Sequence, residues 1–132
     1  MVLADASELS EPFSWPASGA TRVPFRLFSD PEIYALEQQR IFRGRVWNYL
    51  CLEIDIPNPG DFKTTFIGET PIVVIRDENG DINALVNRCA HKGALVCLQE
   101  RGNKAKNGMT CVYHSWTYDL RGQLKGIAFR NG

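Results

Sequence analysis

The sequence predicts a mostly β fold preceded by one N-terminal helix, and three observations carry this prediction. Short runs rich in β-branched and aromatic residues recur between positions 46 and 86. Clusters of Gly, Pro, Asn and Asp separate these runs and mark turns. Helical spacing of apolar residues is clear between about positions 31 and 42. A chain of 132 residues has room for one domain with a real core.

The helix is expected over residues 31–42. Ser29 or Asp30 can cap it, and Pro31 suits its first turn. Glu32 follows Ser29 by three positions, the spacing of a capping box. An apolar stripe should pack on the domain and consists of Ile33, Leu36, Ile41 and Phe42. The opposite, polar side consists of Glu37, Gln38, Gln39 and Arg40. Gly44 is expected to end the helix.

The strands are expected at residues 46–52, 62–67, 72–76 and 82–86. Asn79-Gly80 predicts a tight hairpin turn between the third and the fourth of these runs. Residues 110–112 and 117–120 are predicted to flank a later loop, and Arg121-Gly122 should form a turn.

Composition excludes several functional classes. Fifteen basic and fifteen acidic residues cancel, which leaves no global field to attract nucleic acid or acidic membranes. No run of 18 apolar residues exists, so no membrane span is expected. The N-terminus lacks the pattern of a signal peptide, and we therefore expect a cytoplasmic protein.

The chemistry is expected in two short motifs, Cys89-Ala90-His91 and Cys111-Val112-Tyr113-His114, which are separated by nineteen residues. Each motif offers one thiolate and one imidazole. A single zinc ion can use two Cys and two His, but zinc sites usually draw a Cys pair from one turn and a His pair from a helix. Mixed pairs on two loops instead suit a dinuclear iron–sulfur cluster in which two imidazoles replace two thiolates on one iron. Zinc and no metal remain the alternatives.

Two further cysteines, Cys51 and Cys97, lie among apolar residues. We expect buried, inert thiols at both positions. A disulfide between them would be unusual in a reducing compartment.

The motifs carry a family resemblance. Residues 87–94 read Asn-Arg-Cys-Ala-His-Lys-Gly-Ala, and residues 111–119 read Cys-Val-Tyr-His-Ser-Trp-Thr-Tyr-Asp. They resemble the Rieske domain of the large (α) subunit of aromatic-ring-hydroxylating oxygenases, and the resemblance is greatest to the salicylate and anthranilate branch. Further similar segments are residues 22–25, 41–44, 47–49, 59–62 and 129–130.

The resemblance implies a Rieske-type antiparallel β-sandwich with two cluster-binding loops. Its cofactor is a [2Fe-2S] cluster, with Cys89 and Cys111 on the inner iron and His91 and His114 on the outer iron. Backbone N–H groups near Gly93, Ala94, Ser115 and Trp116 are expected to donate to the cluster sulfurs, while Trp116 and Tyr118 shield the site. Ser115 stands where many members have Gly, and Lys92 stands where Arg is common. Ala94 and Tyr113 occupy the positions of a clamping disulfide in high-potential Rieske proteins, so the low-potential, oxygenase type is expected.

The resemblance also implies that electron transfer and hydroxylation take place in different domains. In the family, hydroxylation occurs at a mononuclear Fe(II) in a separate catalytic domain, held by two His and one carboxylate. This chain has two His, and the cluster motif uses both. We therefore expect an electron-transfer segment that does not hydroxylate a ring alone. Its domains would be an arm at 1–22, a helical segment at 23–45 and a Rieske domain at 46–132 that stops before its last strands, leaving an exposed sheet edge.

The implied partners are a ferredoxin or reductase as electron donor and other α subunits, with or without a β subunit. Residues 99–108 are rich in Lys, Arg, Gly and Asn. They are expected to form either a solvated loop or, with Arg88 and Lys92, the rim of a contact for an acidic ferredoxin. Two alternative functions remain, a free-standing Rieske ferredoxin and a zinc-stabilised binding module.

Overall fold

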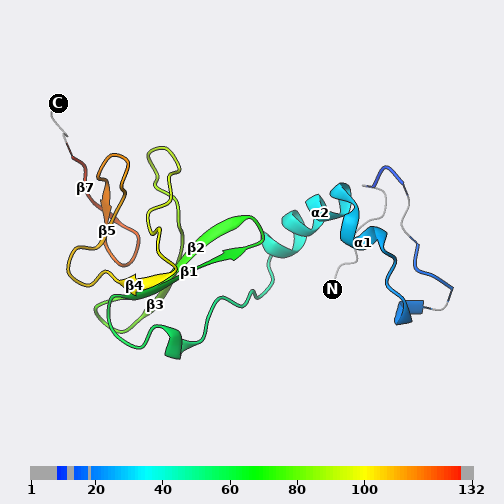
Figure 1. Ribbon diagram of the computed structural model, residues 1–132, viewed down its shortest axis with the longest axis horizontal. Helices are drawn as coiled ribbons and strands as arrows, with labels where there is room; N and C mark the ends of the chain where they lie inside the picture. Colours follow the sequence, from blue (N-terminus) through cyan, green and yellow to red (C-terminus); the bar gives the residue numbers. More distant parts are fainter. Residues whose placement is uncertain (1–8, 12–13, 18, 129–132) are drawn as a thin grey trace. The chain divides into compact units, whose positions relative to one another are not determined.

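The computed structural model describes residues 9–11, 14–17 and 19–128 (Figure 1). Two compact units divide the chain: unit 1 extends to Trp47, and unit 2 begins at Asn48. The N-terminal arm expected at residues 1–22 lies partly outside the described residues. Residues 129–130, part of the resemblance, also lie outside them.

Unit 1 contains short helices. They are the 3-10 turn η2 (Gly19–Thr21), α1 (Arg26–Ser29), α2 (Pro31–Glu37) and the π turn η3 (Gln38–Phe42), which continues α2. Asp30 caps α2, because its Oδ1 accepts hydrogen bonds from the N–H groups of Glu32 (2.8 Å) and Ile33 (3.4 Å). The capping box with Ser29 does not form: the Ser29 hydroxyl donates to the carbonyl of Phe25, and the Glu32 carboxylate accepts from Ser10.

The helical residues 31–42 were predicted, but the apolar stripe is only partly as expected. Ile33 is buried, whereas Ile41 is 47% exposed and Gln38, expected on the polar side, is 5% exposed. A π turn has more residues per turn than an α-helix. The wider turn therefore changes the direction of the side chains after Gln38 and moves Ile41 away from the face of Ile33. Gly44 follows the helix, and a Cβ there would collide with the carbonyl oxygen of Arg40.

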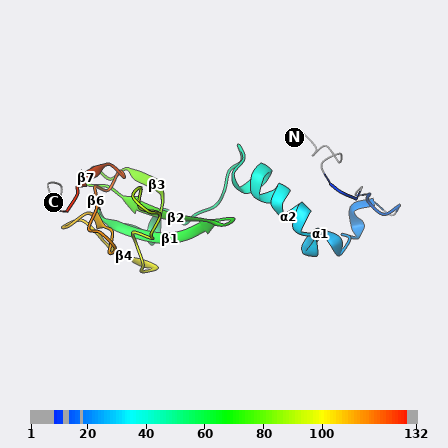
Figure 2. The same ribbon diagram turned by 90° about the horizontal axis from the view of Figure 1, so that it is seen from above.

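Unit 2 is built from two antiparallel sheets (Figure 2). Sheet A has the order β3-β2-β1-β4, formed by β1 (Asp61–Ile67), β2 (Thr70–Arg76), β3 (Ile82–Val86) and β4 (Arg101–Asn103). Sheet B has the order β5-β6-β7, formed by β5 (Met109–Thr110), β6 (Thr117–Tyr118) and β7 (Leu124–Gly126). The predicted hairpin is confirmed, since β2 and β3 pair around the turn at Asn79-Gly80, where Gly80 has φ +91°.

Two expectations for unit 2 are wrong. Residues 46–52 form no strand: Leu50 and Cys51 pack against buried Ile56, Ile72 and Val74, while the side chain of Trp47 is fully exposed. An apolar, β-branched run predicts burial, but a strand also needs a neighbouring strand to accept its hydrogen bonds. Conversely, the polar segment 99–108 contains β4, which pairs with the start of β1.

The core lies between the two sheets. It combines Phe62, Val73 and Ile75 of sheet A with Met109 and Tyr118 of sheet B. The same cluster of buried residues includes Cys89, Cys97 and Cys111. Both candidate ligand loops are therefore anchored in the buried core of unit 2, which limits the movement of the thiols.

The two cysteines outside the motifs are free thiols. Cys97 is 2% exposed, and Cys51 is half-buried. Burial raises the pKa of both thiols, so each is protonated and unreactive at neutral pH. Of the helices in the described ranges, none has the length and apolar character that crossing a bilayer requires.

A partly buried ion pair joins the β2–β3 turn to the segment before β7. Asp77, at the β2–β3 turn, is 1% exposed, and its Oδ2 lies 2.8 Å from Nε of Arg121, which precedes β7. Its Oδ1 accepts from the N–H groups of Asn79 and Asp81. Burial opposes ionisation of this carboxyl, but Arg121 and the two N–H groups outweigh it, and the pKa of Asp77 is lowered.

We expect this pair to make unit 2 sensitive to acid. A carboxyl with a lowered folded-state pKa stabilises the fold above its unfolded-state pKa of about 3.9, and the contribution is lost as pH falls through the folded-state value. Asp77→Asn should therefore lower the urea midpoint clearly at pH 7, and the difference from the parent chain should shrink toward pH 3. A difference that stays constant over this range would contradict the ionic role of Asp77.

Candidate metal centre

The two ligand motifs form loops of the same design, which extend side by side from unit 2 (Figure 1). In the first loop, the N–H of Cys89 donates to the carbonyl of Ala94, and the N–H of Gly93 donates to the carbonyl of Cys89, both at 2.8 Å. In the second loop, Cys111 donates to Trp116 at 2.8 Å and Ser115 donates to Cys111 at 3.0 Å. Each loop is thus closed by a pair of backbone hydrogen bonds about its cysteine.

The fifth residue of each loop has a left-handed backbone. Gly93 has φ +71° and Ser115 has φ +55°, and Ser115 is the non-glycine residue with positive φ in the described ranges. The left-handed region costs an L-residue about 1 kcal/mol or more, which explains why glycine suits this position. Ser115 therefore carries local strain that Gly93 avoids.

We expect Ser115→Gly to raise stability by about 0.5 kcal/mol, because relief of strain exceeds the added freedom of the unfolded chain. The matched change Gly93→Ala should lower stability by about 1 kcal/mol. A Cβ at Gly93 meets no atom within 4 Å, so this loss would be conformational and not steric. Urea unfolding followed by circular dichroism measures the change in stability of each variant. A loss of stability in Ser115→Gly would contradict backbone strain at this position.

The two thiols of the motifs lie in the core. Cys89 and Cys111 are 4% and 2% exposed and belong to the same cluster of buried residues. The hydroxyl of Tyr118 lies 3.2 Å from the Sγ of Cys89 and accepts a hydrogen bond from the N–H of Ala90 at 3.0 Å. Because the N–H of Ala90 donates to the hydroxyl oxygen, the hydroxyl proton is available to point at the sulfur.

These contacts favour a thiolate at Cys89. Burial opposes ionisation of the thiol, but the Tyr118 hydroxyl, the N–H groups of His91 and Lys92 and the Cys111 thiol outweigh it, and the pKa of Cys89 is lowered. The pKa of Tyr118 is raised, first by its own burial and then by Cys89, so Tyr118 remains a neutral donor. Thiolate is the form in which cysteine binds metals.

The two imidazoles lie at the surface beside each other. Both His91 and His114 are exposed, and their ring centroids are 4.7 Å apart in an edge-to-face arrangement. The ring of Trp116 stacks on His91 at 4.9 Å, and the ring of Tyr113 stacks on His114 at 3.9 Å. Aromatic neighbours thus fix the orientation of both imidazoles.

The donor set fits a dinuclear cluster better than a single metal ion. In the described part of the chain, no three His, Cys, Asp or Glu side chains converge as a mononuclear site requires. The structure instead places two thiols together inside and two imidazoles together outside. This inner and outer pairing is the ligand arrangement of a Rieske cluster.

Residues near the ligands partly follow the expectation. Tyr118 contacts Cys89, and Trp116 covers His91 while packing against the core. The N–H groups of Gly93 and Ser115, expected to face the cluster sulfurs, close the loops instead. The N–H groups of His91 and Lys92 help to lower the pKa of Cys89.

Asn87 is a supporting residue to which the sequence analysis assigned no role. It is 3% exposed, its Nδ2 donates to the carbonyl of Cys97, and its Oδ1 accepts from the N–H groups of Val96 and Cys97. The side chain thereby fastens the exit of the first loop to the end of β3. A polar amide two residues before the first cysteine was the available signal.

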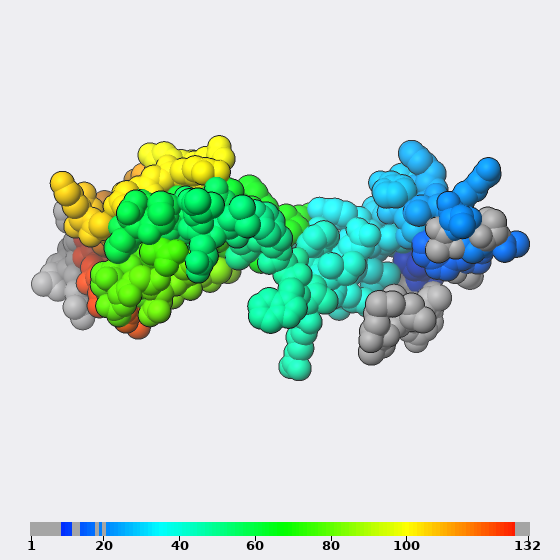
Figure 3. Space-filling model, turned by 90° about the horizontal axis from the view of Figure 1, so that it is seen from below, coloured from blue at the N-terminus to red at the C-terminus, as the bar shows by residue number. Residues whose placement is uncertain are grey.

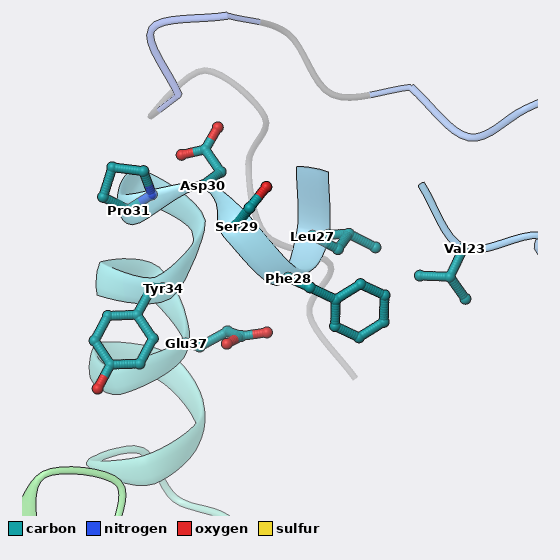
Figure 4. A pocket seen from close by; sticks show the side chains of 8 residues that line it. All are labelled: Val23, Leu27, Phe28, Ser29, Asp30, Pro31, Tyr34 and Glu37. Atoms are coloured by element: carbon teal, nitrogen blue, oxygen red, sulfur yellow. The ribbon is translucent and has the colours of Figure 1, made fainter. Parts of the chain in front are cut away.

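A hollow in unit 1 offers no comparable chemistry (Figure 4). It measures about 520 Å³ and lies between α1, α2 and Val23, with Phe28, Tyr34 and Glu37 among its walls. Neither cysteine nor histidine lines it. The metal-binding chemistry of the described residues is therefore found in unit 2.

A scan of protein families matches residues 46–131 to the Rieske [2Fe-2S] domain. The chain belongs to this family. The match includes both ligand loops and both sheets, so the Rieske-type fold predicted from the motifs is confirmed.

Known relatives are large subunits of ring-hydroxylating oxygenases. The chain is 51% identical to the large subunit of anthranilate 1,2-dioxygenase from Burkholderia cepacia, over 97% of this chain and 29% of that protein. It is 53% identical to a terminal oxygenase α subunit of terephthalate 1,2-dioxygenase from Comamonas sp., over 89% of this chain and 28% of that protein. The Rieske chain thus spans less than a third of these relatives.

A solved structure shows the same fold. Naphthalene 1,2-dioxygenase from Rhodococcus sp., bound to indole, superposes with a TM-score of 0.71 at 41% identity, over 80% of this chain and 23% of that chain. The resemblance to oxygenase α subunits, and to the branch that includes anthranilate, is confirmed by these matches.

Proposed function

We propose that this Rieske chain is the electron-transfer part of an aromatic-ring-hydroxylating oxygenase α subunit. The observation that carries the proposal is the pairing of two buried thiols, Cys89 and Cys111, with two exposed, adjacent imidazoles, His91 and His114. In this proposal the cysteines hold the inner iron and the histidines hold the outer iron. A [2Fe-2S] cluster bound there accepts and releases one electron, at a higher potential than an all-cysteine cluster.

The protein contributes position and environment. The closed backbone of each loop fixes the cysteines, and the stacked rings of Trp116 and Tyr113 fix the imidazoles. Buried thiols keep water away from the inner side, while the exposed imidazoles leave an outer edge at the surface through which electrons can pass to partners.

The similarity to oxygenase subunits suggests the enzyme in which this chain would work, and we include that enzyme in the proposal. Electrons would come from a ferredoxin or reductase and pass to a mononuclear Fe(II) in a catalytic domain, which hydroxylates an aromatic acid with O₂. The named substrates of the two relatives, anthranilate and terephthalate, are both aromatic carboxylates. Other α subunits, with or without a β subunit, would complete a cytoplasmic enzyme. In it, residues 1–22 would be an arm, 23–45 a helical segment and 46–132 the Rieske domain.

A free-standing Rieske ferredoxin is less well supported. The anthranilate relative matches 97% of this chain, so the similarity extends through the residues that precede the Rieske match at position 46. If the protein were a carrier made of the Rieske domain alone, the similarity of the residues before position 46 to an oxygenase subunit would have no explanation.

The test is reconstitution with iron and sulfide, followed by metal analysis and electron paramagnetic resonance of the reduced chain. We expect two irons per chain and the rhombic signal of a histidine-ligated cluster, both lost in Cys89→Ser and Cys111→Ser. Cys97→Ser, a change at a buried cysteine outside the motifs, is the matched control and should retain both. One zinc per chain without a signal would replace the proposal with a zinc-stabilised module.

The Tyr118 hydroxyl is expected to raise the potential of this centre. A hydrogen bond to sulfur stabilises the more negative, reduced state. Tyr118→Phe removes the hydroxyl but keeps the ring in the core. If the bond contributes about 1.4 kcal/mol to the reduced state, the midpoint should fall by roughly 60 mV for a one-electron couple. Redox titration measures the midpoint potential of both chains. An unchanged potential in Tyr118→Phe would show that the hydroxyl does not raise it.

A further inference from the structure

A hollow of about 230 Å³ opens in unit 2 between β3 and the turn that precedes β7, and we call it the β3 hollow. Its floor consists of side chains that are at most 9% exposed, namely Val73, Val96, Met109 and Tyr118. Its rim lies where the yellow-green segment near position 88 meets the orange-red segment near position 121 at the surface of unit 2 (Figure 3). These segments touch, since a Cβ added at Gly122 would lie 3.1 Å from Cδ2 of Leu85.

The floor of the β3 hollow is apolar in character. Tyr118 contributes its ring, because its hydroxyl is already engaged with the Sγ of Cys89 and the N–H of Ala90. The amide of Asn87, in the wall, is occupied by backbone groups. A buried water needs about two to four polar partners, and the side chains of the floor do not supply them. An apolar group that displaces such weakly held water gains free energy.

The rim carries positive charge. Arg88 and Arg121 are the charged residues of the walls, which include no Asp or Glu. Arg121 is neutralised by Asp77 at 2.8 Å. In contrast, Nη1 of Arg88 donates to the carbonyl of Gly93 at 2.9 Å, and the ion pairs among the described residues do not include Arg88. A guanidinium has more N–H donors than this one bond uses, so Arg88 retains donors for an anion.

The size of the β3 hollow limits what can enter it. An apolar cavity of about 150 Å³ can hold a benzene ring. The β3 hollow is larger, at about 230 Å³, so a six-membered ring fits together with a carboxyl group. The planar guanidinium fork matches both oxygens of a carboxylate. The walls therefore select a molecule that is apolar at one end and anionic at the other.

We propose that the β3 hollow binds a small monocarboxylate, whose apolar ring or branched chain enters the floor and whose carboxylate pairs with Arg88. The site is made by the side chains of unit 2 and does not require a cluster, so its failure would leave the electron-transfer function untouched. The bound molecule would contact the ring of Tyr118, whose hydroxyl lies 3.2 Å from the Sγ of Cys89. It would therefore lie beside the first ligand loop.

The first test is isothermal titration calorimetry of the full 132-residue chain with four probes. Cyclohexanecarboxylate should bind at least about tenfold more tightly than cyclohexanecarboxamide, which lacks the charge, and than acetate, which lacks the ring. Pyrene-1-carboxylate has the same charge but is too large to enter, so it should bind no better than acetate. Equal affinities, tightest binding of pyrene-1-carboxylate or no binding of cyclohexanecarboxylate would overturn the proposal, because the hollow would then select nothing.

The second test locates the anion at Arg88. Arg88→Gln should weaken binding of cyclohexanecarboxylate about tenfold and leave that of cyclohexanecarboxamide nearly unchanged. Arg88→Lys keeps the charge but not the planar fork, so its affinity should lie between those of the parent chain and Arg88→Gln. The matched control is Lys106→Gln, which removes one positive charge at an exposed residue of unit 2 outside the walls of the β3 hollow. It should bind cyclohexanecarboxylate as the parent chain does.

Circular dichroism of each variant shows whether it is folded. A folded Arg88→Gln chain that binds cyclohexanecarboxylate as tightly as the parent, or no more weakly than Lys106→Gln, would overturn the proposal. If Arg88→Gln does not fold, Arg88→Lys and the four probes on the parent chain decide it, because a parent chain that does not discriminate by charge and size would overturn it without any variant.

Discussion

Replacing His91 and His114 together with cysteine is expected to lower the midpoint potential of the reconstituted chain by about 250 mV or more. Clusters with two imidazole ligands have potentials of about −150 to +300 mV, whereas all-cysteine plant-type clusters lie near −400 mV. The physical reason is charge: each thiolate adds a negative charge that the neutral imidazole lacks, and a more negative cluster accepts an electron less readily.

Spectroelectrochemical titration, with electron paramagnetic resonance on the same samples, measures this change. The control is Tyr113→Phe, which keeps the ring stacked on His114 at 3.9 Å but alters no ligand; its potential should stay close to that of the parent chain. A double variant that binds iron and sulfide yet keeps the parent potential would show that the imidazoles do not hold the outer iron.

The second large effect is expected at Asn87. Asn87→Leu keeps a similar volume but leaves the N–H groups of Val96 and Cys97 and the carbonyl of Cys97 without their partner. Each unsatisfied buried group costs about 1–3 kcal/mol, so the variant should lose at least about 3 kcal/mol of stability. A loss of this size is a large fraction of the stability of a small domain.

Asn83→Leu is the matched control for this prediction. Asn83 lies on the neighbouring strand β3, and its Nδ2 is buried without a hydrogen-bond partner. Its replacement removes an unsatisfied group and should be neutral or slightly stabilising. Urea unfolding measures the free energy of unfolding of both variants. Equal losses of stability in Asn87→Leu and Asn83→Leu would mean that side-chain volume, and not hydrogen bonding, determines the effect at Asn87.

Local sequence patterns were sufficient to predict the elements that are stabilised by residues close to them in the sequence. Asn79-Gly80 predicts a hairpin because only a few residue types tolerate its backbone angles, and β2 and β3 pair around it. The helix start was predictable because Asp30 binds N–H groups two and three residues away. The candidate ligands were proposed on a different basis, because the chemistry of the side chains determines which residues can bind a metal.

Features that depend on distant partners were not predictable. Residues 46–52 have the composition of a strand but no strand beside them, and residues 101–103 lack that composition yet pair with β1. The contact between Tyr118 and Cys89 joins positions 29 residues apart. Tyr118 was expected near the site, but its hydrogen bond to a particular sulfur depends on how the two sheets pack. Asn87 was missed for the same reason, because its partners lie nine and ten residues later.

The matching closure of the two ligand loops has a consequence for cluster assembly. The backbone hydrogen bonds at Cys89 and Cys111 join main-chain atoms of the same loop and use no side chain that would bind iron. We therefore expect the loops to lose much of their conformational entropy during folding. The amides of Gly93 and Ser115 should then be protected from exchange even before iron and sulfide are added, which hydrogen exchange measures.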